Sequence, residues 1–205
     1  MLQRSSFNLS DVSGVITQQD ILVVKGFADE PLCDAVIAAA HDVDIPRLAK
    51  PDWQIANWVS TWQQDSMFDY YRFSDVNALG SDCLLECFDA MRTVIDSIRT
   101  SNRHAIKYEA GLRYHLELLH YGHGHYFGRH AHEFDPQCVG LILLLNQAGR
   151  DYASGGTVFH DATESVDIND HAGKGDLVIF RYDMQHEVTP VSGTQGRWTA
   201  VLPYY

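Results

Sequence analysis

The chain has 205 residues, 45% of them hydrophobic and 20% charged, a composition that predicts one folded globular domain with its own core. Its net charge of -12 argues against nucleic acid as a partner, because neutralising phosphates requires a basic surface. No apolar run approaches the roughly 20 residues of a membrane span, and the N-terminal residues lack the apolar core of a signal peptide.

The four cysteines, Cys33, Cys83, Cys87 and Cys138, form no CxxC pair. Cys83 and Cys87 lie one helical turn apart, where buried reduced thiols are expected more often than half of a zinc site. A reducing compartment fits this usage. We therefore expect a cytoplasmic protein that is a monomer or a homodimer and has no membrane contact.

Two segments in the first half of the chain are predicted to be helices. Residues 30–41 follow Asp29, a good N-cap, and residues 82–100 follow Ser81. Apolar residues in the second segment recur every three or four positions, which predicts one buried face. That face consists of Leu84, Phe88, Met91, Ile95 and Ile98. Residues 1–110 are accordingly expected to be mainly helical support.

Residues 51–73, between these helices, are rich in aromatic side chains and show no regular period. They are expected either to pack on the core or to form a lid or wall of a substrate pocket. Trp58 and Tyr70 are the candidates for substrate contact in this segment.

After residue 110 the hydrophobic period changes to two, which predicts strands. Gly-rich turns separate the short strands and favour a sandwich or barrel over a parallel sheet. The expected strands are 112–121, 138–146, 156–160, 176–182 and 197–204, the second of them buried on both faces. The fold class is therefore α+β, with helices first and a β-barrel core over residues 111–205, in one domain covering residues 1–205.

Histidines concentrate around residues 120–132, and the chain holds 11 in all. If the segment around His130 is extended, His130 and His132 point to one face, and Glu133 and Asp135 point to the other. His186, just after a predicted strand, could supply a third imidazole. Imidazoles suit several first-row metals, so the spacing alone does not identify the ion.

Four motifs from residue 112 onward resemble the Fe(II)- and 2-oxoglutarate-dependent dioxygenases of the prolyl-hydroxylase-like group. They are YGHGHYFGRHAH (Tyr121 to His132), SGGTVFHD (Ser154 to Asp161), AGKGDLVIF (Ala172 to Phe180) and HEVTPVSGTQGRWTAVLPYY (His186 to Tyr205). The resemblance covers about half of the chain, and the order and gaps of the motifs carry it. It implies a double-stranded β-helix, a jelly-roll or cupin-like barrel, with the N-terminal helices packed on one face.

The resemblance also implies a role for several residues. His130 and His186 fall on the two metal histidines, and Arg197 falls on the residue that binds the distal carboxylate of 2-oxoglutarate. Arginine suits that task because its planar guanidinium donates two parallel hydrogen bonds to a carboxylate. Thr199, two residues along the same strand, and Tyr121 are expected to bind the co-substrate as well.

His132 departs from the family's pattern, because the family has a carboxylate two residues after the first histidine. Three outcomes stay open at this position: His132 binds the metal in a three-histidine site, it turns away, or Glu133 or Asp135 replaces it. We favour binding by His132. Three neutral imidazoles with the dianion of 2-oxoglutarate leave Fe(II) uncharged overall, where a carboxylate ligand would leave one negative charge.

The implied activity is oxidation of an unactivated C–H bond, hydroxylation by default, with Fe(II), 2-oxoglutarate and O2 as cofactors and succinate and CO2 as products. The expected substrate is a small molecule or an amino-acid or peptidyl side chain, with Arg129 as a further candidate for its carboxylate. Two alternatives stay open: a cupin-type three-histidine dioxygenase that uses no 2-oxoglutarate, and a non-catalytic metal- or small-molecule-binding barrel.

Overall fold

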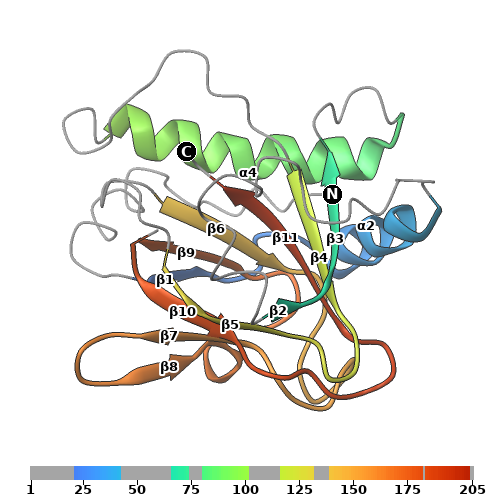
Figure 1. Ribbon diagram of the computed structural model, residues 1–205. Helices are drawn as coiled ribbons and strands as arrows, with labels where there is room; N and C mark the ends of the chain where they lie inside the picture. The colour runs from blue at the N-terminus through green and yellow to red at the C-terminus, as the bar shows by residue number, and fades with distance from the viewer. Residues whose placement is uncertain are drawn as a thin grey trace, which may run out of the picture.

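The structure is a computed structural model that describes residues 21–42, 66–73, 80–101, 116–131, 139–181 and 183–203. Two antiparallel sheets face each other, and a layer of helices covers the outer face of the larger sheet (Figure 1). This is the predicted α+β architecture of a double-stranded β-helix with helices on one face.

In the described part of the chain, two helices form the outer layer. Helix α2 (Glu30–Asp42) begins where Asp29 predicted it, because the Asp29 carboxylate accepts a hydrogen bond of 2.9 Å from the Leu32 amide. Helix α4 (Asp82–Ser101) begins after Ser81, whose carbonyl accepts from the Leu85 amide. Both helices were predicted to within one residue at each end.

The larger sheet, here the major sheet, has the strand order β1-β9-β6-β11-β4-β3 in the described part of the chain. Its strands are β1 (Ile21–Val24), β9 (Leu177–Arg181), β6 (Val139–Leu144), β11 (Arg197–Pro203), β4 (Leu116–Tyr121) and β3 (Asp69–Phe73). Every residue of β6 is buried, because helices cover one face of this sheet and the second sheet covers the other.

The smaller sheet, here the minor sheet, has the order β2-β5-β10-β7-β8 among the described residues. Its strands are β2 (Ser66–Met67), β5 (Tyr126–His130), β10 (Gln185–Val188), β7 (Thr157–His160) and β8 (Ser165–Asp167), and the short 3-10 helix η3 (Ile168–Asp170) follows β8. Edge strands β2 and β3 are consecutive in the chain, so residues 66–73 cross from one sheet to the other.

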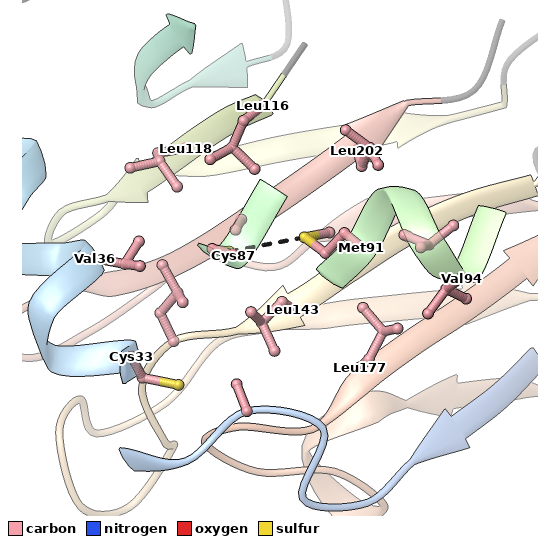
Figure 2. Close-up of a cluster of buried hydrophobic side chains, with 14 of the residues drawn as sticks. Cys33, Val36, Cys87, Met91, Val94, Leu116, Leu118, Leu143, Leu177 and Leu202 are labelled. Atoms are coloured by element: carbon pink, nitrogen blue, oxygen red, sulfur yellow. Dashed lines mark hydrogen bonds between the residues drawn. The ribbon is translucent and has the colours of Figure 1, made fainter. Parts of the chain in front are cut away.

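The main core lies between the helices and the major sheet. Figure 2 shows side chains of both helices and of the strands converging there, including Cys33, Val36, Met91, Leu118 and Leu143. The sulfur atoms of Cys87 and Met91 lie 4.0 Å apart, drawn as a dashed line. Burial raises the pKa of the Cys33 thiol to about 12 and also raises that of Cys87, so these cysteines act as unreactive core residues.

Side chains along β11 point alternately toward this core and toward the space between the two sheets. Trp198, Ala200 and Leu202 pack against the helices, so Arg197 and Thr199 face the space between the two sheets. Strand β11, which was predicted from residue 197 onward, therefore contributes side chains both to the core beneath the helices and to the space between the two sheets.

Several strands differ from the sequence prediction. Strands β1, β2, β3, β8 and β10 were not anticipated, and β2 and β3 fall inside the aromatic-rich segment. The rest of that segment, including Trp58, lies outside the described residues. No helix in the described part of the chain is both long and apolar enough to span a membrane.

Candidate active site

His130 and His186 lie directly opposite each other on β5 and β10, and their ring centroids are 4.3 Å apart. The pairing contains an irregularity: three residues of β10, from His186 to Val188, oppose four of β5, from His130 to Phe127. In a regular strand, residues 127 and 130 would face opposite sides of the sheet. This bulge turns both inward, where their rings stack 4.0 Å apart.

The two imidazoles are held neutral and in one tautomer. Nδ1 of His130 donates to the Gly128 carbonyl and Nδ1 of His186 donates to the Met184 carbonyl, both at 2.8 Å, because a carbonyl oxygen can only accept. Burial lowers the pKa of His130 to about 3, aided by His186, and burial lowers the pKa of His186 to about 4. Each ring therefore presents the lone pair of Nε2, the form in which a histidine binds a metal.

Arg197 is a buried cation inside the sandwich, with 1% of its surface exposed. It lies opposite Tyr121 in the β11–β4 pairing, and its guanidinium carbon is 5.5 Å from the centre of the Tyr121 ring. Burial raises the pKa of Tyr121, so the phenol keeps its proton for donation. Among the described residues, Nε of Arg197 and Oγ1 of Thr199 are buried without a hydrogen-bond partner.

Two residues beside Arg197 were missed by the sequence prediction. Nη2 of Arg197 donates a 2.7 Å hydrogen bond to Oγ1 of Thr157, which is itself 2% exposed. Tyr152, also buried, donates to the Asn169 side chain, and burial raises its pKa although the charge of Arg197 opposes this. The only sequence signal for either residue was the position of Thr157 at the start of a predicted strand after two glycines.

These residues fit a metal ion and a dicarboxylate. A buried guanidinium is costly unless its donors are paired. Among the described residues, Nε of Arg197 is unpaired, and together with Oγ1 of Thr199 it forms a set of groups suited to a carboxylate. The two neutral imidazoles fit a first-row metal such as iron. In the described part of the chain, no set of three His, Cys, Asp or Glu residues could hold a metal. His132 lies outside that part, so its role stays a prediction.

The 2OG-Fe(II) oxygenase superfamily model matches residues 116–205, the segment that contributes His130, His186, Arg197 and Thr199. Residues 116–205 thus carry the sequence pattern of the 2OG-Fe(II) oxygenase superfamily. The match supports a 2-oxoglutarate-dependent, non-haem iron oxygenase that uses Fe(II), 2-oxoglutarate and O2. Neither the cupin-type enzyme without 2-oxoglutarate nor the non-catalytic barrel is favoured by this match.

Solved structures place the fold of the oxygenase among prolyl hydroxylases. A Pseudomonas putida prolyl-4-hydroxylase superposes with a TM-score of 0.68 at 16% identity, over 97% of this chain and 100% of the other. A prolyl hydroxylase from Trichoplax adhaerens, in complex with a peptide fragment of the hypoxia inducible factor oxygen degradation domain, has a TM-score of 0.67 at 12% identity, with coverages of 96% and 90%.

A protein with a different activity has a similar fold. The non-heme alpha ketoglutarate dependent epimerase SnoN from nogalamycin biosynthesis has a TM-score of 0.60 at 14% identity, over 95% of this chain and 80% of the other. No curated protein sequence is significantly similar to the oxygenase. The fold therefore leaves the substrate to be argued from the residues of the site.

The residues predicted to contact substrate do not all reach this site. Arg129 is exposed, and its Nε donates to the Gln185 side chain at 2.7 Å. Gln185 precedes His186 in β10, so the Arg129–Gln185 pair lies on the outer face of the minor sheet. The backbone of Tyr70 pairs with Leu119 on β4, at the edge of the site, and Trp58 lies outside the described residues.

Proposed function

We propose that the oxygenase hydroxylates an unactivated C–H bond of an amino-acid side chain, free or within a peptide. Iron is held by His130, His186 and His132, and the distal carboxylate of 2-oxoglutarate by Arg197, with Thr199 and Tyr121 as further contacts. The observation that carries the proposal is the buried Arg197 guanidinium, which lies in the same interior as the two neutral imidazoles and whose Nε has no hydrogen-bond partner among the described residues.

Bound iron and 2-oxoglutarate together supply the oxidising chemistry, in which O2 is consumed and succinate and CO2 are released. The protein's own residues orient and insulate the reactants. The carbonyls of Gly128 and Met184 fix the two imidazoles, and Thr157 fixes the Arg197 guanidinium. The aromatic rings around His130 and His186, namely Phe127, Phe159 and Phe180, exclude water from this interior.

An amino-acid side chain is favoured by the structures that the fold resembles, two of which are prolyl hydroxylases and one of which contains a peptide. The net charge of -12 supports a substrate other than nucleic acid. The buried cysteines with raised thiol pKa values fit a cytoplasmic protein with reduced thiols. A monomer or homodimer remains our proposal for the oligomeric state.

The test measures co-substrate binding first and turnover second. Mn(II)-loaded protein is titrated with 2-oxoglutarate by calorimetry, and succinate is then measured with Fe(II), O2 and free or peptidyl amino acids. We expect Arg197→Gln to weaken 2-oxoglutarate binding by about 100-fold or more, the loss of a buried charge-assisted pair. Arg150→Gln is the matched control, because Arg150 lies on the surface and pairs with Glu30.

The proposed binding of the metal by His132 is tested in the same assays. His132→Ala is expected to weaken Mn(II) binding, whereas His132→Asp should retain it, because a carboxylate restores the family's usual ligand set. Unchanged Mn(II) affinity in His132→Ala would remove His132 from the ligand set. Absence of 2-oxoglutarate binding to the metal-loaded wild type would overturn the proposed function.

A further inference from the structure

Asn146 is a buried polar residue at the end of the strand next to Arg197. Only 5% of its surface is exposed, and it lies where the chain leaves β6, just before an exposed turn that begins at Gln147. Strand β6 pairs with β11 up to Leu144, which lies opposite Thr199. Continuing this register by two residues places Asn146 opposite Arg197, the first residue of β11.

The pairing of β6 and β11 ends with a side chain in place of the backbone. In a regular antiparallel ladder, the two residues of a hydrogen-bonded pair exchange two N–H···O bonds. The Leu145 amide donates to the Trp198 carbonyl at 3.1 Å, but the Trp198 amide donates to Oδ1 of Asn146 at 2.9 Å. The side chain of Asn146 thus replaces a backbone carbonyl at the end of the ladder.

A second hydrogen bond from the same side chain holds the other side of Arg197. Nδ2 of Asn146 donates to the Gly196 carbonyl at 2.8 Å. The orientation of the Asn146 amide is unambiguous, because a carbonyl oxygen can only accept and a backbone amide can only donate. One side chain therefore holds both the peptide group before Arg197 and the peptide group after it.

Gly196 is also held from the side of β4. Its φ is +70°, and a Cβ atom at this position would lie 2.5 Å from Nε2 of His120 and 2.7 Å from the Tyr121 carbonyl oxygen. Both the backbone angle and the close approach require glycine. The backbone before Arg197 is therefore fixed between β4 on one side and Asn146 on the other.

Arg197 needs such support because it lies at the end of a strand. Thr194 and Gln195, shortly before it, are exposed, and strand ends beside exposed turns open locally more readily than strand centres. Asn146 holds the backbone on both sides of Arg197. Thr157 holds the guanidinium through its 2.7 Å hydrogen bond with Nη2. The long side chain of Arg197 is thus fixed at both ends.

We propose that Asn146 is a positioning residue that sets the place of Arg197 and so gives the co-substrate site its preference for a dicarboxylate. The inference rests on the proposed function, in which Arg197 binds the distal carboxylate of 2-oxoglutarate, and deepens it. A displaced guanidinium loses its aligned hydrogen bonds to that carboxylate. The metal histidines are on the other sheet, so the loss falls on recognition of the distal carboxylate.

The experiment compares two keto acids of equal length. In 2-oxopentanoate a methyl group replaces the distal carboxylate of 2-oxoglutarate, and the keto acid end is the same. Binding of each to Mn(II)-loaded protein is measured by calorimetry, and the ratio of the two Kd values reports recognition of the distal carboxylate. The variant is Asn146→Ala.

Asp176→Ala is the matched control. Asp176 is also a buried polar residue that bonds to backbone, because its carboxylate accepts from the Gly26 and Gly173 amides. It lies at the start of β9, which β6 separates from β11. The control therefore removes a comparable set of hydrogen bonds without touching the backbone of Arg197.

The wild type is expected to bind 2-oxoglutarate at least about 30-fold more tightly than 2-oxopentanoate, the gain from charge-assisted contacts. Asn146→Ala should reduce this ratio about fivefold or more, while the Kd values of 2-oxopentanoate and Mn(II) stay within about twofold. Asp176→Ala should leave the ratio unchanged. An unchanged ratio in Asn146→Ala, an equal weakening of both keto acids, or the same fall in Asp176→Ala overturns the inference.

A second measurement decides if Asn146→Ala does not fold. Exchange of the Trp198 amide hydrogen is followed by NMR in the Mn(II)-loaded wild type, with and without 2-oxoglutarate. We expect this amide to be protected at least about 100-fold before 2-oxoglutarate is added, because Asn146 already holds it. Protection that arises only with 2-oxoglutarate overturns the inference. Failure of the wild type to bind 2-oxoglutarate would instead refute the proposed function.

Discussion

Thr157 illustrates how one hydroxyl can control a buried charge. The guanidinium of Arg197 is aligned by its 2.7 Å hydrogen bond to Oγ1 of Thr157, and both residues are almost fully buried. A long side chain without this contact would sample several orientations before it meets a carboxylate, and ordering it would reduce the affinity.

We therefore predict that Thr157→Val weakens 2-oxoglutarate binding about fivefold, since valine has the same shape but accepts no hydrogen bond. Thr157→Ser, which keeps the hydroxyl, should stay within about twofold of the wild type. Calorimetry on the Mn(II)-loaded proteins measures both. A Kd for Thr157→Val that equals that of Thr157→Ser would contradict the role of the hydroxyl.

The two metal histidines predict a dependence of stability on pH. The pKa values of His130 and His186 are about 3 and about 4, below the value of about 6.5 in the unfolded chain. Between pH 4 and 6.5 the unfolded chain binds protons that the folded chain does not. The free energy of unfolding of the metal-free protein should therefore fall as the pH falls through this window, by up to about 1.4 kcal/mol per pH unit for each histidine.

Urea unfolding of metal-free protein at several pH values measures this slope. His186→Asn should flatten it, because one proton fewer is taken up on unfolding. His171→Asn, which changes an exposed histidine, should leave it close to that of the wild type. If His186→Asn and His171→Asn change the slope equally, the buried imidazoles are not its source.

At the scale of elements, the crossing from β2 to β3 closes one side of the sandwich. Phe68 is the residue between these two edge strands, and its ring packs 5.3 Å from that of Tyr121 and 5.1 Å from that of Phe127. Tyr121 belongs to the major sheet and Phe127 to the minor sheet. One aromatic ring thus spans the two walls and supports both the co-substrate side and the metal side.

Phe68→Ala is accordingly predicted to raise the Kd of 2-oxoglutarate about fivefold, because two aromatic contacts that hold the walls are lost. Phe88→Ala removes an equally large, half-buried ring from α4, on the far side of the major sheet, and serves as the matched control. We expect a similar loss of stability in both variants, measured by urea unfolding, but a change in Kd only in Phe68→Ala. The same Kd in both variants would argue against the bridging role.

Periodicity and capping predicted the helices and the fully buried β6 well, because those signals are local: Asp29 caps α2, and β6 is a continuous apolar run. The shorter strands β2, β8 and β10 have only two to four residues, too few for a period to stand out. The bulge that turns Phe127 and His130 to one face depends on pairing with β10, which is remote in sequence. Thr157 was missed for the same reason, since its role arises from its contact with Arg197 on another strand.

At the scale of the whole molecule, the helices and the site lie on opposite faces of one sheet. Met91 of α4 is fully buried in the cluster that joins the helices to the outer face of the major sheet (Figure 2). On β11, Trp198 belongs to that cluster, whereas Arg197 and Thr199 on either side of it face the interior. The helical layer therefore stabilises the sheet from behind without contributing polar groups to the carboxylate site.

This arrangement predicts that stability and co-substrate binding can be changed separately. Met91→Ala should lower the free energy of unfolding by about 3 kcal/mol, the cost of a cavity in a well-packed core. The Kd of 2-oxoglutarate for the protein that remains folded should stay within about twofold of the wild type, since the backbone of β11 is still held by β4 and β6 on either side. Urea unfolding and calorimetry at low temperature measure the two quantities. If Met91→Ala weakened 2-oxoglutarate binding as strongly as Thr157→Val, the helical layer would be part of the binding machinery, because a cavity behind the sheet would then be moving Arg197 in front of it.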